Sequence, residues 1–187
     1  MSIIMGLDIS TSHIGFCIYD DEKEEILKLE NILLSKLVKD GDIFKKTEIF
    51  KKFITKAVKN YKIDKTIIER PLEAFSMGRS SAGTIIKLHN FNILCQYILC
   101  QISYEYELIA RATIIKAVTG SGRKPKKYTN IDTKEWLGLY FIEEQPSIEL
   151  KRYSRGNKEG KLHPEAYDVI DAWACCKYAQ KIKLKNS

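Results

Sequence analysis

Residues 3–10 read Ile3-Ile4-Met5-Gly6-Leu7-Asp8-Ile9-Ser10, a short apolar run with one carboxylate inside it. A run of this length favours a strand that is covered on both faces over a helix. An ionised Asp8 among Leu and Ile costs several kcal/mol unless a cation or a hydrogen-bond donor lies close to it. The alternative is that Asp8 lies at the strand end and turns to solvent or caps a loop.

Three further acids favour the interpretation that Asp8 is buried beside a cation or a donor. Glu69 also ends an apolar run, Lys65-Thr66-Ile67-Ile68-Glu69. Asp168 and Asp171 are three residues apart in a predicted helix, so they lie on the same helix face. Acids near a helix start are also stabilised by the helix dipole, which accounts for Glu165 better than for Asp171. Four acids on three separate elements are typical of a two-metal phosphodiester site, and all-oxygen ligands favour Mg²⁺.

The order of the predicted elements indicates a mixed sheet. The first three strands form an antiparallel meander, and a long helical crossover then leads to a strand that pairs in parallel. The last helix begins at Pro164, a favoured first helical residue. The predicted strands are 3–10, 14–19, 26–34, 66–69 and 104–110, and the other predicted helices are 42–61 and 84–102.

The predicted helix over 84–102 is apolar on nearly all sides, whereas a surface helix needs one apolar stripe. It therefore needs two partners. The sheet is one of them, and the other is either a second subunit or the C-terminal helix.

Two loops have features of nucleic-acid contacts. Residues 71–83 carry Phe75 and Arg79, and an aromatic residue on such a loop can stack on an unpaired base or pack back on the core. The second loop is basic and glycine-containing, with Pro125 predicted as the first residue of the next helix. Its cations can bind phosphate or simply face solvent; they are Lys116, Arg123, Lys124, Lys126 and Lys127.

Composition sets broader bounds. The chain has 187 residues, which predicts one domain, and its formal net charge of +7 makes nucleic acid a reasonable partner. The five cysteines form no C-x-x-C pair and are interpreted as reduced core residues. We expect an intracellular, cytoplasmic or DNA-associated protein without a signal peptide or membrane segment.

The chain resembles the RuvC family of Holliday-junction resolvases, which belongs to the ribonuclease-H-like superfamily. Four stretches carry the resemblance, and they occur in the order in which the family has them. The stretches are Gly6-Leu7-Asp8, Ile68-Glu69, residues 116–123 and Asp168-Val169-Ile170-Asp171-Ala172. The resemblance implies an α/β, ribonuclease-H-like fold with a five-stranded mixed sheet flanked by helices. It also implies one nuclease domain over residues 1–187. An irregular insertion at about 141–162 departs from bacterial members and suggests a viral or otherwise divergent branch.

The resemblance further implies a homodimer that nicks four-way DNA junctions in pairs, with Mg²⁺ as cofactor and Mn²⁺ as a substitute. Asp8, Glu69, Asp168 and Asp171 would be the catalytic metal ligands. Lys116 and Lys126 would contact DNA or assist the transition state, and Phe75 would be the aromatic residue at the junction. His13, in the turn after the first strand, is either a ligand or a plain surface residue.

Other functions stay open. A RuvC relative that processes ribosomal or other structured RNA would have the same acids. The opening hairpin also resembles the phosphate-binding hairpin of sugar kinases, actin and heat-shock ATPases, although those proteins need a second such domain. A nucleic-acid-binding module without catalysis is the third alternative.

Overall fold

The computed structural model describes residues 2–39, 41–71, 81–102 and 104–186. Five strands form one sheet in the order β3-β2-β1-β4-β5. The strands are β1 (Ile3–Ile9), β2 (Ile14–Asp20), β3 (Glu25–Ile32), β4 (Lys65–Glu69) and β5 (Glu107–Ile109). The α-helices are α1 (Leu34–Leu37), α2 (Ile43–Val58), α3 (Ala82–Gln101), α4 (Arg111–Thr119), α5 (Thr133–Glu144) and α6 (Pro164–Asn186).

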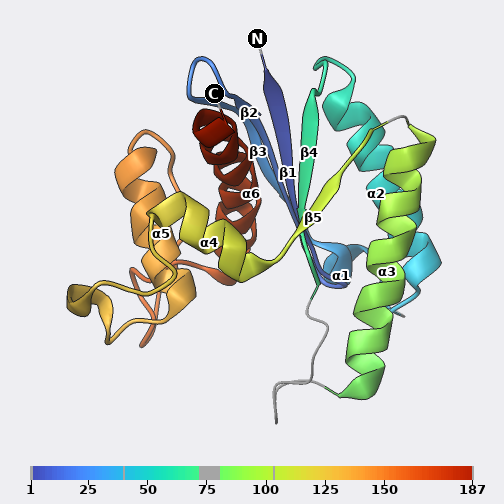
Figure 1. Cartoon of the computed structure of the whole chain (residues 1–187). Coiled ribbons are helices and arrows are strands. Elements are labelled where there is room, and N and C mark those ends of the chain that lie inside the picture. The colour runs from blue at the N-terminus through green and yellow to red at the C-terminus, as the bar shows by residue number, and fades with distance from the viewer. Residues whose placement is uncertain (1, 40, 72–80, 103, 187) are drawn as a thin grey trace.

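The predicted five-stranded mixed sheet is confirmed. The first three strands pair antiparallel, while β4 pairs in parallel with both β1 and β5. Helices α2 and α3 cover one face of the sheet, and α4, α5 and α6 lie on the other (Figure 1). Among the described residues, none of the helices contains an apolar stretch of the length that spanning a bilayer requires.

Strand β1 is central and joins the two apolar cores. Met5 and Leu7 point into the core beneath α2 and α3, whereas Ile4 belongs to the core beneath α6. Alternate residues of a strand point to opposite faces, so Gly6 and Asp8 lie on the α6 side. The buried apolar run thus has the two covered faces that its composition predicts.

Two glycines let α6 approach the sheet closely. A Cβ atom on Gly6 would lie 2.0 Å from the carbonyl oxygen of Ala172, and one on Gly15 would lie 1.9 Å from that of Asp168. Real Cβ atoms do not approach backbone atoms so closely, and a backbone carbonyl in the middle of a helix cannot turn aside. Because Gly15 pairs with Asp8 across the two strands, this contact also sets the separation between Asp8 and the acids of α6.

Several local predictions are wrong. Pro125 does not begin a helix: it precedes the 3₁₀ turn Lys126–Tyr128, and α5 begins only at Thr133, where Asp132 caps the backbone N–H of Glu135. Strand β5 is confined to Glu107–Ile109, because the chain enters α4 directly after it. Sequence patterns did not predict α4 as a helix. Residues 141–144 are the last turn of α5, so the irregular segment begins at Gln145.

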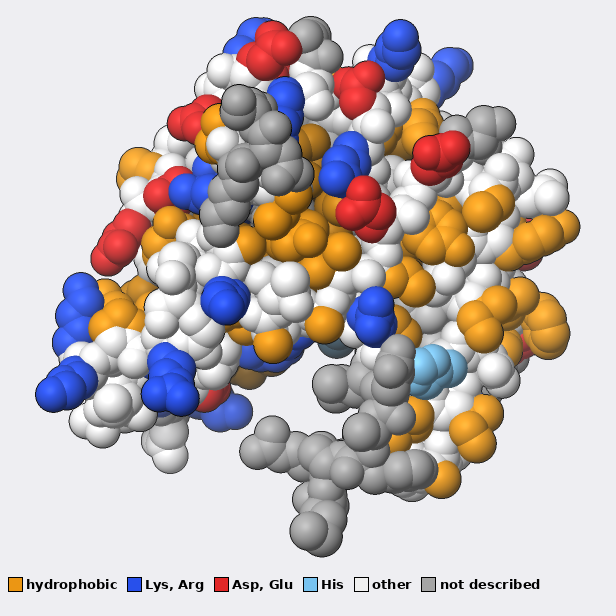
Figure 2. Space-filling view, in the orientation of Figure 1, with side chains coloured by type: hydrophobic (Ala, Val, Ile, Leu, Met, Phe, Trp, Pro, Cys, Tyr) orange, Lys and Arg blue, Asp and Glu red, His pale blue; other side chains and the backbone are white. Residues whose placement is uncertain are grey.

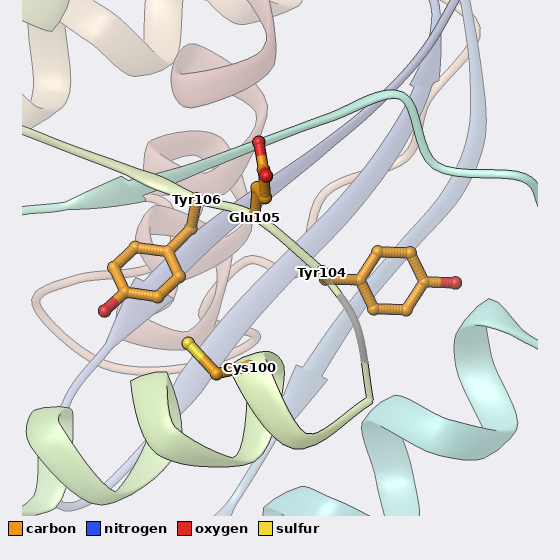
Figure 3. A pocket seen from close by; sticks show the side chains of 4 residues that line it. All are labelled: Cys100, Tyr104, Glu105 and Tyr106. Atoms are coloured by element: carbon orange, nitrogen blue, oxygen red, sulfur yellow. The ribbon is translucent and has the colours of Figure 1, made fainter.

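Two burial predictions are also corrected. Four of the cysteines are buried as expected, but Cys100 is exposed. It lines a surface pocket of about 550 Å³ together with Tyr104, Glu105 and Tyr106 (Figure 3). Helix α6 packs on the sheet face opposite α3 (Figure 1), so it is not the second partner of α3.

We expect Gly6→Ala to destabilise the protein, because the new methyl group would press against the backbone of α6. Overpacking costs about 1–3 kcal/mol, which corresponds to a fall in Tm of about 2–12 °C for a chain of this size. Thermal unfolding followed by circular dichroism measures this. The control is Gly83→Ala, where a Cβ meets nothing closer than 4.0 Å among the described residues, and where a helical Ala should leave Tm unchanged or raise it. Equal Tm values for Gly6→Ala and the wild type would contradict the close contact.

Candidate active site

The predicted acids converge on the α6 side of the sheet. Asp8 comes from β1, Glu69 is the last residue of β4, and Asp168 and Asp171 lie in α6. Burial raises the pKa of Asp8 well above its ordinary value, and the negative charges of Glu69, Asp171 and Asp168 raise it further. All three neighbours therefore lie within electrostatic reach of Asp8.

A guanidinium group bridges two of these acids. Arg111, the first residue of α4, donates from Nη1 to both oxygens of Glu69 at 3.2 and 3.0 Å. Its Nη2 donates to Oδ1 of Asp171 at 2.8 Å. Burial opposes the charge of Arg111, but Asp171 and Glu69 more than compensate and raise its pKa. Burial raises the pKa of Glu69, and Arg111 opposes that shift.

A second cation reaches Asp171 from α5. The Nζ of Lys134 lies 3.7 Å from Oδ2 of Asp171, whose side chain is only 2% exposed. That separation is too long for a hydrogen bond, and Oδ2 has no hydrogen-bond partner within the described residues. A buried carboxylate oxygen without a donor is a position at which a further cation would be stabilised.

Asp168 is held by the sheet. Asn31 at the end of β3 donates from Nδ2 to Oδ2 of Asp168 at 2.9 Å, and also to the carbonyl oxygen of Glu165. The Nδ1 of His13 lies 3.4 Å from the same Oδ2. Burial raises the pKa of Asp168, while Asn31 and His13 lower it. His13 is therefore part of the cluster and not a plain surface residue.

The donor set fits a divalent cation in its chemistry. It consists of four carboxylates, it leaves one buried oxygen without a donor, and it holds Asp8 in a position where its charge is poorly compensated. Oxygen-only ligands are those that Mg²⁺ prefers. In the described part of the chain, however, no three His, Cys, Asp or Glu side chains converge closely enough to hold a metal ion together. Arg111 instead lies between Glu69 and Asp171.

Within the described residues, the predicted DNA contacts have neighbours other than the four acids. Lys116 lines a pocket of about 510 Å³ with Tyr140, Tyr178 and Lys181, on a different side of α4 from Arg111. The Nζ of Lys124 donates to the carbonyl oxygen of Ile131. Lys127 lies over the ring of Tyr128, and Arg123 and Lys126 are exposed. Lys and Arg side chains gather over this loop between α4 and α5 at the lower left of Figure 2. Phe75 and Arg79 lie outside the described residues.

Three residues of the cluster were not predicted: Arg111, Lys134 and Asn31. Arg111 follows the short strand β5, and its only sequence signal is an isolated cation after an apolar strand end. Lys134 follows the Asp-Thr pair that starts α5, a recognisable helix start. Neither signal says which carboxylates the cation would meet.

Solved structures share this architecture. Thermus thermophilus RuvC in complex with a Holliday junction substrate has a TM-score of 0.66 and 11% sequence identity over 98% of this chain and 96% of that one. The chain has a RuvC-like fold. A second T. thermophilus RuvC structure has a TM-score of 0.61 at 12% identity, covering 98% of this chain and 96% of that one. The yeast mitochondrial Holliday junction resolvase has a TM-score of 0.60 at 12% identity, covering 99% of this chain and 82% of its own.

No protein-family model and no curated protein matches the sequence. The resemblance predicted from four short stretches is thus confirmed at the level of the RuvC-like, ribonuclease-H-like fold. The roles of the individual site residues remain predictions.

We expect Asp8→Asn to raise the stability of the metal-free protein, since the substitution removes a half-buried charge that three other acids repel. Each 1 kcal/mol gained would raise Tm by about 2–4 °C in a chain of this size. The same variant should lose the stabilisation that added Mg²⁺ or Mn²⁺ gives the wild type. Thermal unfolding with EDTA and with metal measures both effects.

The control is Asp42→Asn, at the N-cap of α2, where the side chain accepts from the N–H groups of Phe44 and Lys45. Asn caps a helix about as well as Asp, so this variant should match the wild type. A lower Tm for Asp8→Asn in EDTA would show that a donor or cation already compensates Asp8.

Proposed function

We propose that this protein is a metal-dependent endonuclease that nicks four-way DNA junctions, and that residues 1–187 form a single nuclease domain. The observation that carries the proposal is that acids from β4 and α6 lie within electrostatic reach of Asp8 on β1, on one side of a RuvC-like sheet. The branched-DNA substrate is proposed from the fold neighbours, which are Holliday junction resolvases.

Asp8, Glu69, Asp168 and Asp171 would hold Mg²⁺, or Mn²⁺ in its place. When bound, such ions lower the pKa of a coordinated water and stabilise the attacking and leaving oxygens of a phosphodiester. The chain's own residues orient these ligands: Asn31 and His13 fix one oxygen of Asp168, and the close approach of α6 brings both helix acids to β1. Lys134, which is half exposed beside Asp171, is placed to approach a phosphate oxygen.

The basic loop would contribute the phosphate contacts. Arg123, Lys126 and Lys127 are exposed on one continuous segment, and Lys124 is tied to the backbone at Ile131. Contacts of this kind position the duplex and carry no sequence information. We retain Lys116, Phe75 and Arg79 as proposed DNA contacts, with Lys116 acting away from the acids.

We also propose that the protein is a homodimer that pairs through its α2–α3 face. Among the described residues, most of the exposed large apolar side chains lie on α1, α2 and α3: Leu37, Phe44, Ile86, Ile93 and Tyr97. Hydrophobic side chains line the same side of the molecule, at the right of Figure 2. Leu37, Phe44, Leu94, Tyr97 and Ile98 also help to line a pocket of about 600 Å³. Exposed apolar side chains grouped in this way are typical of an interface, and a symmetric one would present two sites to a symmetric junction.

The test of function offers the protein a four-way DNA junction, linear duplex, RNA–DNA hybrid and structured RNA, each with Mg²⁺ or Ca²⁺. We expect nicking of the junction with Mg²⁺ and binding without nicking with Ca²⁺. Ca²⁺ takes more ligands at longer distances, so it misplaces the attacking water. Glu69→Gln and Asp171→Asn should each abolish nicking but still bind the junction in Ca²⁺, because phosphate contacts dominate affinity.

The control for these variants is Glu159→Gln, an exposed acid in the irregular segment, which should nick like the wild type. Wild-type nicking by Glu69→Gln or Asp171→Asn would remove the proposed site. Preferential cutting of RNA would favour an RNA-processing nuclease, and ATP hydrolysis without nicking would favour the kinase-like alternative.

The dimer is tested by Ile93→Glu, which places a charge on the exposed face of α3. If this face pairs with a second copy, the variant should sediment as a monomer at micromolar concentrations at which the wild type is a dimer. The matched control is Leu184→Glu, because Leu184 is 67% exposed on α6 and Ile93 is 60% exposed. A wild-type monomer, or equal effects of the two variants, would contradict the proposed interface.

A further inference from the structure

Arg111 occupies most of the ligand positions that two of the acids offer. Glu69 and Asp171 have four carboxylate oxygens between them, and the guanidinium donates to three of these. The fourth, Oδ2 of Asp171, has no hydrogen-bond partner in the described part of the chain. A divalent ion that used Glu69 would therefore meet a positive charge at hydrogen-bond distance from its ligand. The guanidinium and the ion compete for the same oxygens.

The Arg111 side chain can move away from the two acids toward solvent. Its side chain is 25% exposed, whereas that of Asp171 is 2% exposed, so the arginine lies between the buried acid and solvent. As the first residue of α4, Arg111 also stands at the positive end of a nine-residue helix. The helix dipole disfavours a cation there, and the contacts with Glu69 and Asp171 offset this unfavourable interaction. An anion would be favoured at the same place, because the dipole and the guanidinium would both attract it.

From these contacts, and building on the proposed function, we propose that Arg111 is a positioning residue that couples metal binding to DNA binding. Without DNA, its guanidinium neutralises Glu69 and Asp171 and keeps a divalent ion from them. A backbone phosphate of bound DNA accepts the same fork of hydrogen bonds, because phosphate, like carboxylate, suits bidentate arginine. The acids are then released to the metal. DNA and metal thus favour the same position of Arg111, and each raises the affinity for the other by the same factor.

The first test measures metal binding without DNA. Free Mn²⁺ is titrated by electron paramagnetic resonance against the wild type, Arg111→Gln and Arg111→Lys. Coupling between two sites is about 5–150-fold in typical cases, so Arg111→Gln should bind Mn²⁺ more tightly by a factor of about that size. Arg111→Lys keeps the charge but cannot span both acids, so its affinity should fall between the other two. Arg155→Gln, an exposed arginine of the irregular segment, is the control and should match the wild type.

The second test measures the coupling itself. Junction affinity is determined with EDTA and with saturating Ca²⁺, which avoids nicking. The dissociation constant in EDTA is divided by that in Ca²⁺, and this ratio is compared between proteins. We expect a larger ratio for the wild type and Arg155→Gln than for Arg111→Gln. Circular dichroism confirms that each variant is folded, and Arg111→Lys serves if Arg111→Gln is not.

The outcomes separate this inference from the proposed function. If the wild type and Arg111→Gln bind Mn²⁺ equally, the metal site stands and the role of Arg111 is wrong. Weaker binding by Arg111→Gln would overturn it too, because Arg111 would then hold the acids in place for the metal. If no variant binds Mn²⁺ at millimolar concentrations, the metal site itself fails, and the proposed nuclease fails with it.

Discussion

Helix α6 packs directly against the backbone of the two glycines of β1 and β2, and this contact decides where the acids lie. Helix α6 lies so close to the sheet that no side chain fits at Gly6 or Gly15, and the two helix backbone atoms concerned belong to Ala172 and Asp168. The glycines that admit the helix are therefore in register with the acids that it carries. A methyl group at either position would move the helix outward and take Asp168 and Asp171 away from Asp8. The same contact therefore determines both the packing of α6 on the sheet and the positions of the acids.

This close packing creates an electrostatic problem. Four carboxylates share a space that water reaches poorly, and burial together with mutual repulsion raises the pKa of Asp8. Unpaired buried charges cost several kcal/mol, so the cluster needs cations. Arg111 and Lys134 supply part of that charge, and Asn31 supplies a donor to Asp168. Functional sites commonly hold such unfavourable arrangements, which the rest of the fold must outweigh.

The sequence predicts the elements that carry the acids better than those that carry the cations. The buried run at β1, the Pro164 start of α6 and the crossover to β4 all have strong local signals, and each was predicted correctly. Helix α4 has only nine residues, and its N-cap residue Ala110 makes no side-chain cap, so nothing in its composition marks its start. The bridge from Arg111 to Glu69 and Asp171 joins residues 42 and 60 positions apart, a pairing that no local pattern contains. Lys116 was predicted as a DNA contact from its place in a motif. The side of α4 on which it lies depends on how the helix packs, which the motif does not specify.

The acids and the cations thus come from different parts of the architecture. The acids lie on β1, β4 and α6, whose positions are set by the two apolar cores. The cations lie in the first turns of α4 and α5, where the helix dipole opposes them. A long side chain at a helix start can turn toward the acids or toward solvent with little change in the backbone, whereas Asp8 cannot leave its strand without disrupting the sheet. The acids are therefore held rigidly and the charge around them is adjustable, a division that would suit the proposed metal site, which has to be stable both without and with a bound cation.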